Sequence, residues 1–170
     1  MANAMPQAIG AKLAAPNRQV VALCGDGGLT MLMGELLTAA GLDISVKLMV
    51  FNNSTLGMVR AEMEVAGYPP FGTDVRNPDF GVLAQAVGLH GERVERAEDI
   101  RPAIERALAH EGPALIDFVT DPRTLAMPPR TEAGQVRGMA LAMTKLVFSG
   151  DSAEVFETIK SNLRSIPQVL

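Results

Sequence analysis

The stretch Cys24–Gly28, Cys-Gly-Asp-Gly-Gly, together with the pair Asn52–Asn53, decides the fold of this chain. The apolar, β-prone residues 19–24 lead into the glycines, and residues 46–51 lead into the asparagines in the same way. Both runs are typical of buried strands. Residues 29–41 between them have the length and composition of a helix. Because a strand–helix–strand crossover makes its two strands parallel, the sequence predicts an α/β fold with a parallel sheet flanked by helices.

Two polar side chains follow the ends of these strands. Parallel strands end at one edge of a sheet, so we expect Asp26 and Asn53 to converge there. A carboxylate and an amide oxygen suit a hard divalent cation, and the bare N–H groups of glycines at a helix start suit a phosphate. The edge is therefore predicted to bind a metal-bound diphosphate. A simpler interpretation makes Asp26 a helix cap and the glycines a turn, but it leaves the asparagine pair unexplained.

The rest of the chain continues the α/β pattern. Glycines and prolines make residues 54–78 irregular, and the prolines after residue 121 mark a linker. We therefore expect an α/β domain over residues 1–122, and a linker with a C-terminal helical tail over residues 123–170. Further helices are predicted over residues 4–15, 58–65, 80–88, 97–110, 131–149 and 151–164, and further strands over residues 92–95 and 114–120.

The composition argues against several classes of protein. The chain has 170 residues, of which 48% are hydrophobic, and a formal net charge of −4 without a basic stripe, so no nucleic-acid partner is expected. The single cysteine excludes an internal disulfide and is compatible with a reducing cytoplasm. Cys24 itself is interpreted as a small apolar filler of a buried strand. No apolar run approaches the ~20 residues that span a bilayer, so we expect a soluble, cytoplasmic α/β domain.

The motifs resemble those of one enzyme family. The Gly-Asp-Gly and Asn-Asn pair, with Ala2–Ala11 ahead of it, resembles the diphosphate-binding C-terminal domain of thiamine-diphosphate-dependent enzymes. Within that family the chain is most similar to pyruvate oxidase, in particular the quinone-linked bacterial pyruvate dehydrogenase. The resemblance implies a fragment of a longer enzyme, which also has an aminopyrimidine-binding domain and a central FAD-binding domain. The segments that carry the narrower likeness are Leu32–Leu36, Phe51–Gly57 and Gly112–Asp117.

The resemblance implies a role for each polar group at the edge. Asp26 and Asn53 would bind Mg²⁺ through side-chain oxygens, and the carbonyl of Thr55 would be a third protein ligand. Mg²⁺ keeps a near-octahedral shell, which diphosphate oxygens and a water could complete. Gly27 and Gly28 would present their N–H groups to the diphosphate.

The resemblance also implies apolar and loop contacts around the cofactor. The loop Ser54–Gly57, which includes Leu56, would close around it, and Met1 would lie under the bent cofactor. Met58 and Glu62 would line the substrate pocket, with Met58 also touching the cofactor. Related enzymes often have phenylalanine at the position of Met58. A loop in which neither residue contacts substrate is an equally compatible interpretation.

The activity implied by the resemblance is oxidative decarboxylation of pyruvate to acetate and CO₂. Pyruvate or a related 2-oxo acid would be the substrate, thiamine diphosphate, Mg²⁺ and FAD the cofactors, and a quinone the electron acceptor. The glutamate that activates the cofactor belongs to the aminopyrimidine-binding domain of a neighbouring subunit in a homodimer or homotetramer. No catalytic residue is therefore expected in this chain, which alone should be inert.

Other functions remain compatible with the same residues. An acetolactate-synthase-like carboligase or another 2-oxo-acid decarboxylase would keep the cofactor and change the reaction. A non-catalytic assembly module would keep only the fold. The tail, residues 150–170, has an amphipathic pattern, and in the quinone-linked branch the tail contacts the inner face of the membrane; packing on its own subunit is the alternative. The apolar positions of this pattern are Val155, Phe156, Ile159, Leu163 and Ile166.

Overall fold

The computed structural model of the chain describes residues 1–124 and 133–162, which form two compact units. The sheet unit contains residues 1–54 and 76–120, and the helical unit contains residues 55–75 with the described part of residues 121–162. Residues 55–75 thus group with the C-terminal helices, although they lie inside the predicted domain 1–122. A cofactor-binding domain with those bounds stays a prediction.

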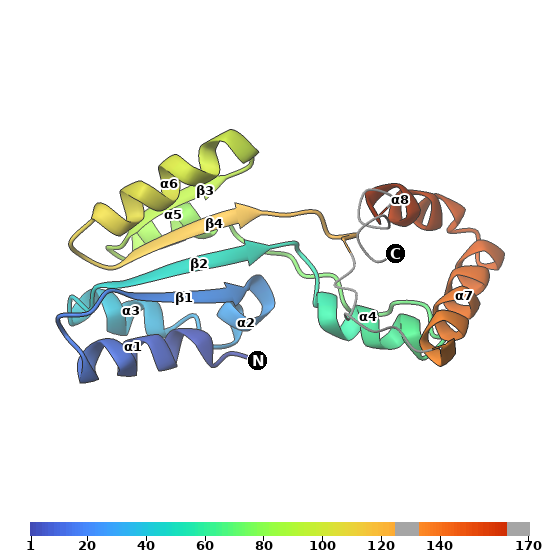
Figure 1. Cartoon of the computed structure of the whole chain (residues 1–170), viewed down its shortest axis with the longest axis horizontal. Helices are drawn as coiled ribbons and strands as arrows, with labels where there is room; N and C mark the ends of the chain where they lie inside the picture. The colour runs from blue at the N-terminus through green and yellow to red at the C-terminus, as the bar shows by residue number, and fades with distance from the viewer. Residues whose placement is uncertain (125–132, 163–170) are drawn as a thin grey trace. The chain divides into compact units, whose positions relative to one another are not determined.

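The sheet unit is built on four parallel strands in the order β1-β2-β4-β3 (Figure 1). The strands are β1 Val20–Gly25, β2 Val46–Asn52, β3 His90–Val94 and β4 Ala114–Val119. Helices flank the sheet, as a parallel sheet requires because its crossovers lie on its faces. The predicted α/β fold class is confirmed. The third strand in the chain begins two residues before the predicted start at residue 92.

The register of the strands brings the two sequence motifs to one edge of the sheet. Gly25 at the end of β1 pairs with Phe51, and Asn52 at the end of β2 pairs with Val119 of β4. Asp26 follows Gly25 directly, so its backbone lies at the level of the asparagine pair. We call this the carboxyl edge, since the carboxyl ends of the parallel strands meet there.

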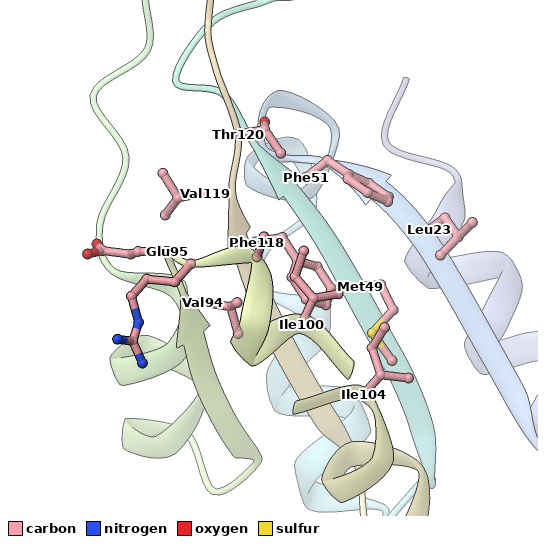
Figure 2. A pocket seen from close by; sticks show the side chains of 12 residues that line it. Leu23, Met49, Phe51, Val94, Glu95, Ile100, Ile104, Phe118, Val119 and Thr120 are labelled. Atoms are coloured by element: carbon pink, nitrogen blue, oxygen red, sulfur yellow. The ribbon is translucent and has the colours of Figure 1, made fainter. Parts of the chain in front are cut away.

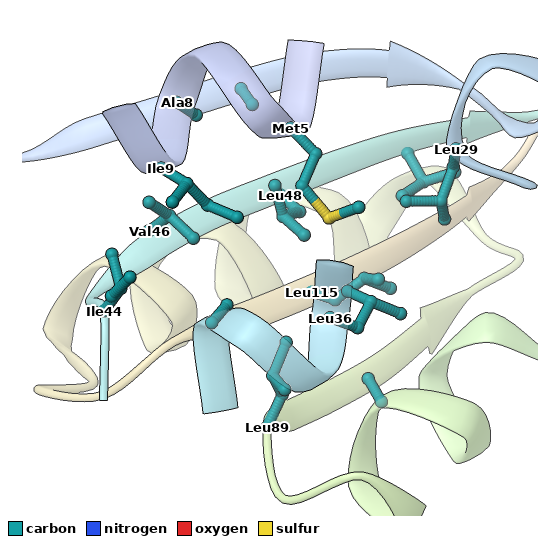
Figure 3. Close-up of a cluster of buried hydrophobic side chains, with 14 of the residues drawn as sticks. Met5, Ala8, Ile9, Leu29, Leu36, Ile44, Val46, Leu48, Leu89 and Leu115 are labelled. Atoms are coloured by element: carbon teal, nitrogen blue, oxygen red, sulfur yellow. The ribbon is translucent and has the colours of Figure 1, made fainter. Parts of the chain in front are cut away.

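One side of the sheet, the closed face, is covered by α1 Ala4–Ala14, α2 Asp26–Met31, α3 Glu35–Gly41 and α5 Phe80–Ala86. Apolar side chains of these helices interdigitate with alternate residues of the strands (Figure 3). Burial of this size is the main force that stabilises such a unit. The buried cluster includes Met5, Ile9, Ala22, Leu29, Leu36, Val46, Leu48, Val50, Phe80 and Leu115.

The single helix predicted over residues 29–41 is wrong in its continuity. The structure has two short helices, α2 and α3, separated by a turn at residues 32–34. The amide of Leu32 donates to the carbonyl of Leu29, and that of Glu35 to the carbonyl of Leu32, so the turn uses tighter i→i−3 bonds. Gly34 lowers the helix propensity there, and Leu29 of α2 and Leu36 of α3 both pack into the closed face.

The other side, the open face, is covered by α6 Ala97–Ala109 alone among the described residues. This helix packs on β3 and β4 through a small cluster that includes Ala103, Ala107 and Ile116. Beyond the helix, Leu23 of β1 is 65% exposed and Phe51 of β2 is 48% exposed. A pocket of about 420 Å³ lies between α6 and these strands (Figure 2).

The opposite, amino edge of the sheet holds a buried lysine. Lys47 of β2 is only 2% exposed, and its ammonium donates to the carbonyl oxygens of His110 and Gly112 and to the hydroxyl of Ser45. Burial lowers the pKa of this amine. The interaction joins the start of β2 to the loop that leads into β4.

Two glycines let α5 approach the sheet closely. A Cβ added to Gly91 of β3 would lie 2.1 Å from the carbonyl oxygen of Gly81 in α5, which is a severe steric clash. The side chain of Asp79 caps α5 by accepting from the amide of Val82. The chain just before this helix, including Asn77, is thereby placed against the carboxyl edge.

The helical unit contains α4 Gly57–Val65, α7 Ala133–Phe148 and α8 Ser152–Asn162, in agreement with the helices predicted there. Charged side chains join its parts: the guanidinium of Arg60 contacts Glu64 and Glu154, and Arg123 contacts Glu154. In residues 1–124 and 133–162, no helix combines the length and the apolar character that crossing a membrane requires.

Candidate functional site

Asp26 is the first residue of α2 and lies at the carboxyl edge, directly after the outer strand β1. It is only 2% exposed, although a buried carboxylate is costly unless other groups bond to it. The side-chain amide of Asn77 donates to Oδ2 of Asp26 at 2.5 Å and to Oδ1 of Asn52 at 2.9 Å. Both oxygens therefore lie beside the same nitrogen atom, Nδ2 of Asn77. The edge brings a carboxylate and an amide oxygen together.

The orientation of Asn52 is set from the other side by Asp117. Nδ2 of Asn52 donates to Oδ1 of Asp117 at 2.9 Å, which turns the amide oxygen toward Asn77. Asp117 is fully buried in β4, and its second oxygen accepts from the amide of Phe80 and from the guanidinium of Arg93 at 2.8 Å. A chain of polar contacts thus runs across the edge from β1 to β3.

The two asparagines of the pair have different environments. Asn52 is 3% exposed and is held in the polar chain, whereas Asn53 is half-buried one residue beyond the end of β2. Ser54 follows with a φ of 55°, in the left-handed region, and its hydroxyl donates to Oδ1 of Asn52 at 3.3 Å. This turn ends the strand sharply, so Asn53 stands at the edge. Its binding of Mg²⁺ stays a prediction.

The glycines lie beside the start of the chain. Gly27 is buried in the first turn of α2, and a Cβ at Gly28 would lie 3.6 Å from the backbone nitrogen of Ala2. The N–H groups of a first helical turn have no partner within the helix, so they are free to bind an anion. Met1 is exposed next to Ala2. The roles of Gly27, Gly28 and Met1 toward a cofactor stay predictions.

The other predicted contact residues belong to the helical unit. Thr55 is buried there, and its hydroxyl donates to the carbonyl of Thr73, as does the amide of Leu56. Gly57 begins α4, on which Met58 and Glu62 are both exposed one turn apart. The predicted carbonyl ligand of Thr55 and the predicted substrate pocket stay predictions.

The residues at the edge fit a hard divalent cation. One buried carboxylate and nearby amide oxygens are ligands that Mg²⁺ takes in proteins. Oδ1 of Asn77 is buried and finds no hydrogen-bond partner among the described residues, which is unusual for a polar atom in a finished protein interior. Such an orphaned oxygen is consistent with an edge that is completed by a further polar group.

Sequence reasoning missed three members of this polar chain, Asn77, Asp117 and Arg93. In the sequence, Asn77 stands with Pro78 just before the helix predicted over residues 80–88, a position that indicates a helix start rather than a site residue. A clearer signal was available for Asp117, because it is the one charged residue within the apolar strand 114–119. A carboxylate in such a strand requires partners, and therefore indicates a polar cluster at that end of the sheet.

Comparison with known proteins identifies the family of the chain. The family model for the thiamine pyrophosphate enzyme, C-terminal TPP binding domain, matches residues 1–118. The chain belongs to the thiamine pyrophosphate enzyme family. YdaP of Bacillus subtilis (strain 168), named as a thiamine pyrophosphate-containing protein, is 32% identical over 95% of this chain and 28% of its own length.

Members of the family with named reactions are also similar. The mitochondrial acetolactate synthase catalytic subunit of Aspergillus candidus is 36% identical over 75% of this chain and 19% of its own length. The solved thiamine diphosphate-dependent 4-hydroxybenzoylformate decarboxylase of Rhodococcus jostii RHA1 is 38% identical, with a TM-score of 0.65, over 71% of this chain and 23% of that one. The chain spans less than a third of the length of these relatives. They support the family and not the narrower pyruvate oxidase branch.

Proposed function

We propose that this chain is the diphosphate- and Mg²⁺-binding part of a thiamine-diphosphate-dependent enzyme that decarboxylates a 2-oxo acid. The observation that carries the proposal is the polar edge, where Asn77 holds Oδ2 of Asp26 beside Oδ1 of Asn52. Membership of the family supplies the identity of the cofactor. Thiamine diphosphate, when bound, supplies a nucleophilic carbon and an electron sink for decarboxylation.

The chain's own residues would bind and orient. Asp26 and Asn53, with the carbonyl of Thr55, would hold Mg²⁺, and the N–H groups of Gly27 and Gly28 would hold the diphosphate. Asp117 supports this arrangement from below, because it turns the amide oxygen of Asn52 toward the edge. No residue of the sheet unit is assigned a proton-transfer step. We propose that the activating glutamate lies in another part of the full-length enzyme, so the chain alone is inert.

Metal-dependent binding tests this proposal directly. Isothermal calorimetry of the chain with Mg²⁺ and inorganic diphosphate should give binding that weakens at least ~10-fold in Asp26→Ala. Asn17→Ala, an exposed asparagine outside the edge, is the matched control and should bind like the wild type. Equal binding by the Asp26 variant and the wild type would overturn the proposal and favour a non-catalytic assembly module.

The finer reaction has two candidates. The sequence motifs favour a pyruvate oxidase or quinone-linked dehydrogenase, with FAD in a central domain and acetate as the product. The similarity to an acetolactate synthase favours a carboligase that joins two 2-oxo acids. Full-length enzyme with pyruvate distinguishes them: acetate formed together with a reduced quinone supports the first candidate, and acetolactate formed without an added electron acceptor supports the second.

The C-terminal tail is proposed to contact lipid in the first of these candidates. Phe156 and Ile159 of α8 are exposed, while Leu163 and Ile166 lie outside the described residues. Glu154 on the same helix is instead bonded to Arg60 and Arg123, which supports packing within the unit. Flotation with anionic vesicles, with and without residues 150–170, tests the proposal; equal flotation of both proteins would overturn it.

A further inference from the structure

Asn77 contacts both Asp26 and Asn52 at the site, and neither the motifs nor the family comparison assigns it a role. We propose that Asn77 positions Asp26 so that the carboxylate coordinates the cation through Oδ1 alone, and that it thereby favours Mg²⁺ over Ca²⁺. This inference rests on the proposed metal site. It concerns only the chain's own residues, and it is tested by binding rather than by turnover.

The direction of the Asn77 amide is determined by its surroundings. Its NH₂ group lies between two oxygens, Oδ2 of Asp26 and Oδ1 of Asn52, and donates to both. A flipped amide would place its oxygen against the carboxylate, which is repulsive. Asn52 cannot flip to compensate, because its own NH₂ group donates to the buried Asp117. The hydrogen bonds that fix the Asn77 amide therefore run through Asn52 to the buried carboxylate of Asp117.

These hydrogen bonds engage one oxygen of Asp26, Oδ2, and do not engage the other, Oδ1. Oδ2 accepts the Asn77 hydrogen bond at 2.5 Å, and no hydrogen bond within the described residues engages Oδ1. Each carboxylate oxygen has two lone pairs, but the donor beside Oδ2 already occupies part of the space and charge there, so Oδ1 is the oxygen better placed for a cation. Mg²⁺ demands near-ideal octahedral geometry with short bonds, whereas Ca²⁺ takes more ligands and accepts bidentate carboxylates. The arrangement therefore suits the smaller ion.

The chemistry of asparagine at position 77 is what the inference requires. Leucine has a similar size but no donor, so it would free Oδ2 and let Asp26 become bidentate. Aspartate has the same shape and would replace the donor with a second carboxylate beside Asp26. Both changes should favour Ca²⁺ relative to Mg²⁺, and aspartate should do so more because it adds charge and oxygen ligands.

The experiment measures the dissociation constants of Mg²⁺ and Ca²⁺ separately by calorimetry, on the 170-residue chain with saturating inorganic diphosphate. In Asn77→Leu, the preference for Mg²⁺ over Ca²⁺ should fall about 10-fold relative to the wild type, within the range known for groups that orient metal ligands. Asn17→Leu makes the same change at an exposed position and should leave the preference unchanged. Far-UV circular dichroism verifies that each variant is folded.

The possible results separate this inference from the proposed function. Equal loss of affinity for both ions in Asn77→Leu would mean only structural support, and an unchanged preference would mean no role; either overturns the inference. Asn77→Asp, which keeps the side-chain shape, decides the matter if the leucine variant does not fold. If wild-type binding does not require Asp26, the proposed metal site itself fails.

Discussion

The two faces of the sheet differ in how completely this chain covers them. On the closed face Leu48 is fully buried under helices, whereas on the open face Leu23, one strand away, is 65% exposed beside a pocket. Both strands are nevertheless apolar on both sides, as is usual when a parallel sheet is covered on both faces. The difference teaches that apolar strands reveal a two-sided core without revealing what covers each side. Exposed apolar surface of this kind is typical of sites that contact protein, membrane or ligand.

The largest expected effect is on stability. Leu48→Ala should lower the free energy of unfolding by about 3 kcal/mol, because it leaves a cavity in the closed face. Leu23→Ala makes the same chemical change on the open face and should cost less than about 0.5 kcal/mol. Urea unfolding followed by circular dichroism measures both variants. Similar losses in the two would break the comparison.

The second effect is on the reactivity of Cys24, which packs against the closed face. Burial, with a smaller contribution from the charge of Asp26, raises the pKa of this thiol from 9.0 to about 11. The thiolate is the reactive form, and the greater nucleophilicity of a high-pKa thiolate offsets only part of its scarcity. The native thiol should therefore react with a disulfide reagent at pH 8 at least about 10-fold more slowly than the thiol of the urea-unfolded chain. Native rates within a few-fold of the unfolded ones would show that solvent reaches this strand.

A third effect concerns the open face alone. Phe51 is exposed at the pocket, so Phe51→Lys should reduce the fluorescence of an apolar dye such as ANS bound to the folded chain. Val82→Lys is the matched control, since it removes an exposed apolar residue of α5 that does not line this pocket. If the two variants reduce dye binding equally, the pocket is not the apolar surface that binds it.

The smallest effect is an acid sensitivity of the open face. Glu92 of β3 accepts two hydrogen bonds from Arg106 of α6, and this contact, aided by His90, holds the pKa of the carboxyl below its usual 4.5. A carboxyl with a lowered folded-state pKa stabilises the protein above pH 4.5, and the contribution is lost as the pH falls through the lowered value.

The test follows the melting temperature between pH 5.5 and pH 3.5. Wild type should lose about 1–2 °C more than Glu92→Gln over this range, as expected for a partly exposed ion pair. Glu105→Gln, on α6 beside Arg106, is the control and should behave like the wild type. A loss in Glu92→Gln as large as in the wild type would show that α6 is held to β3 by apolar packing alone.

Most of the fold could be predicted because its signals are local. The strands that flank the glycines and asparagines are apolar, β-prone and bounded by turns, and the predicted elements appear in the predicted order. The break between α2 and α3 was missed because helix composition does not report a turn that tertiary packing favours. The grouping of residues 55–75 with the C-terminal helices depends on contacts between distant parts of the chain, such as Arg60 with Glu154, which no local pattern contains.

The location of the candidate site could be predicted from the sequence, but the hydrogen bonds among its side chains could not. Asp26 and the asparagine pair could be placed at one edge because parallel topology requires it. Asn77 reaches that edge only because α5 lies against β3, which depends on a close contact of two glycines from different elements. The sequence shows Gly81 and Gly91 but does not show that they contact each other. The residues that orient Asp26 are therefore visible only in three dimensions.

The buried amine of Lys47 provides a chemical measure of local opening at the amino edge of the sheet. The chain has four lysines, and in the folded protein the amine of this one is surrounded by carbonyl and hydroxyl oxygens. An acylating reagent should therefore label Lys12, Lys145 and Lys160 first, and reach Lys47 only when the loop before β4 lifts away. The rate at which mass spectrometry detects a label on Lys47 itself would then count those opening events, in a chain that carries no added probe.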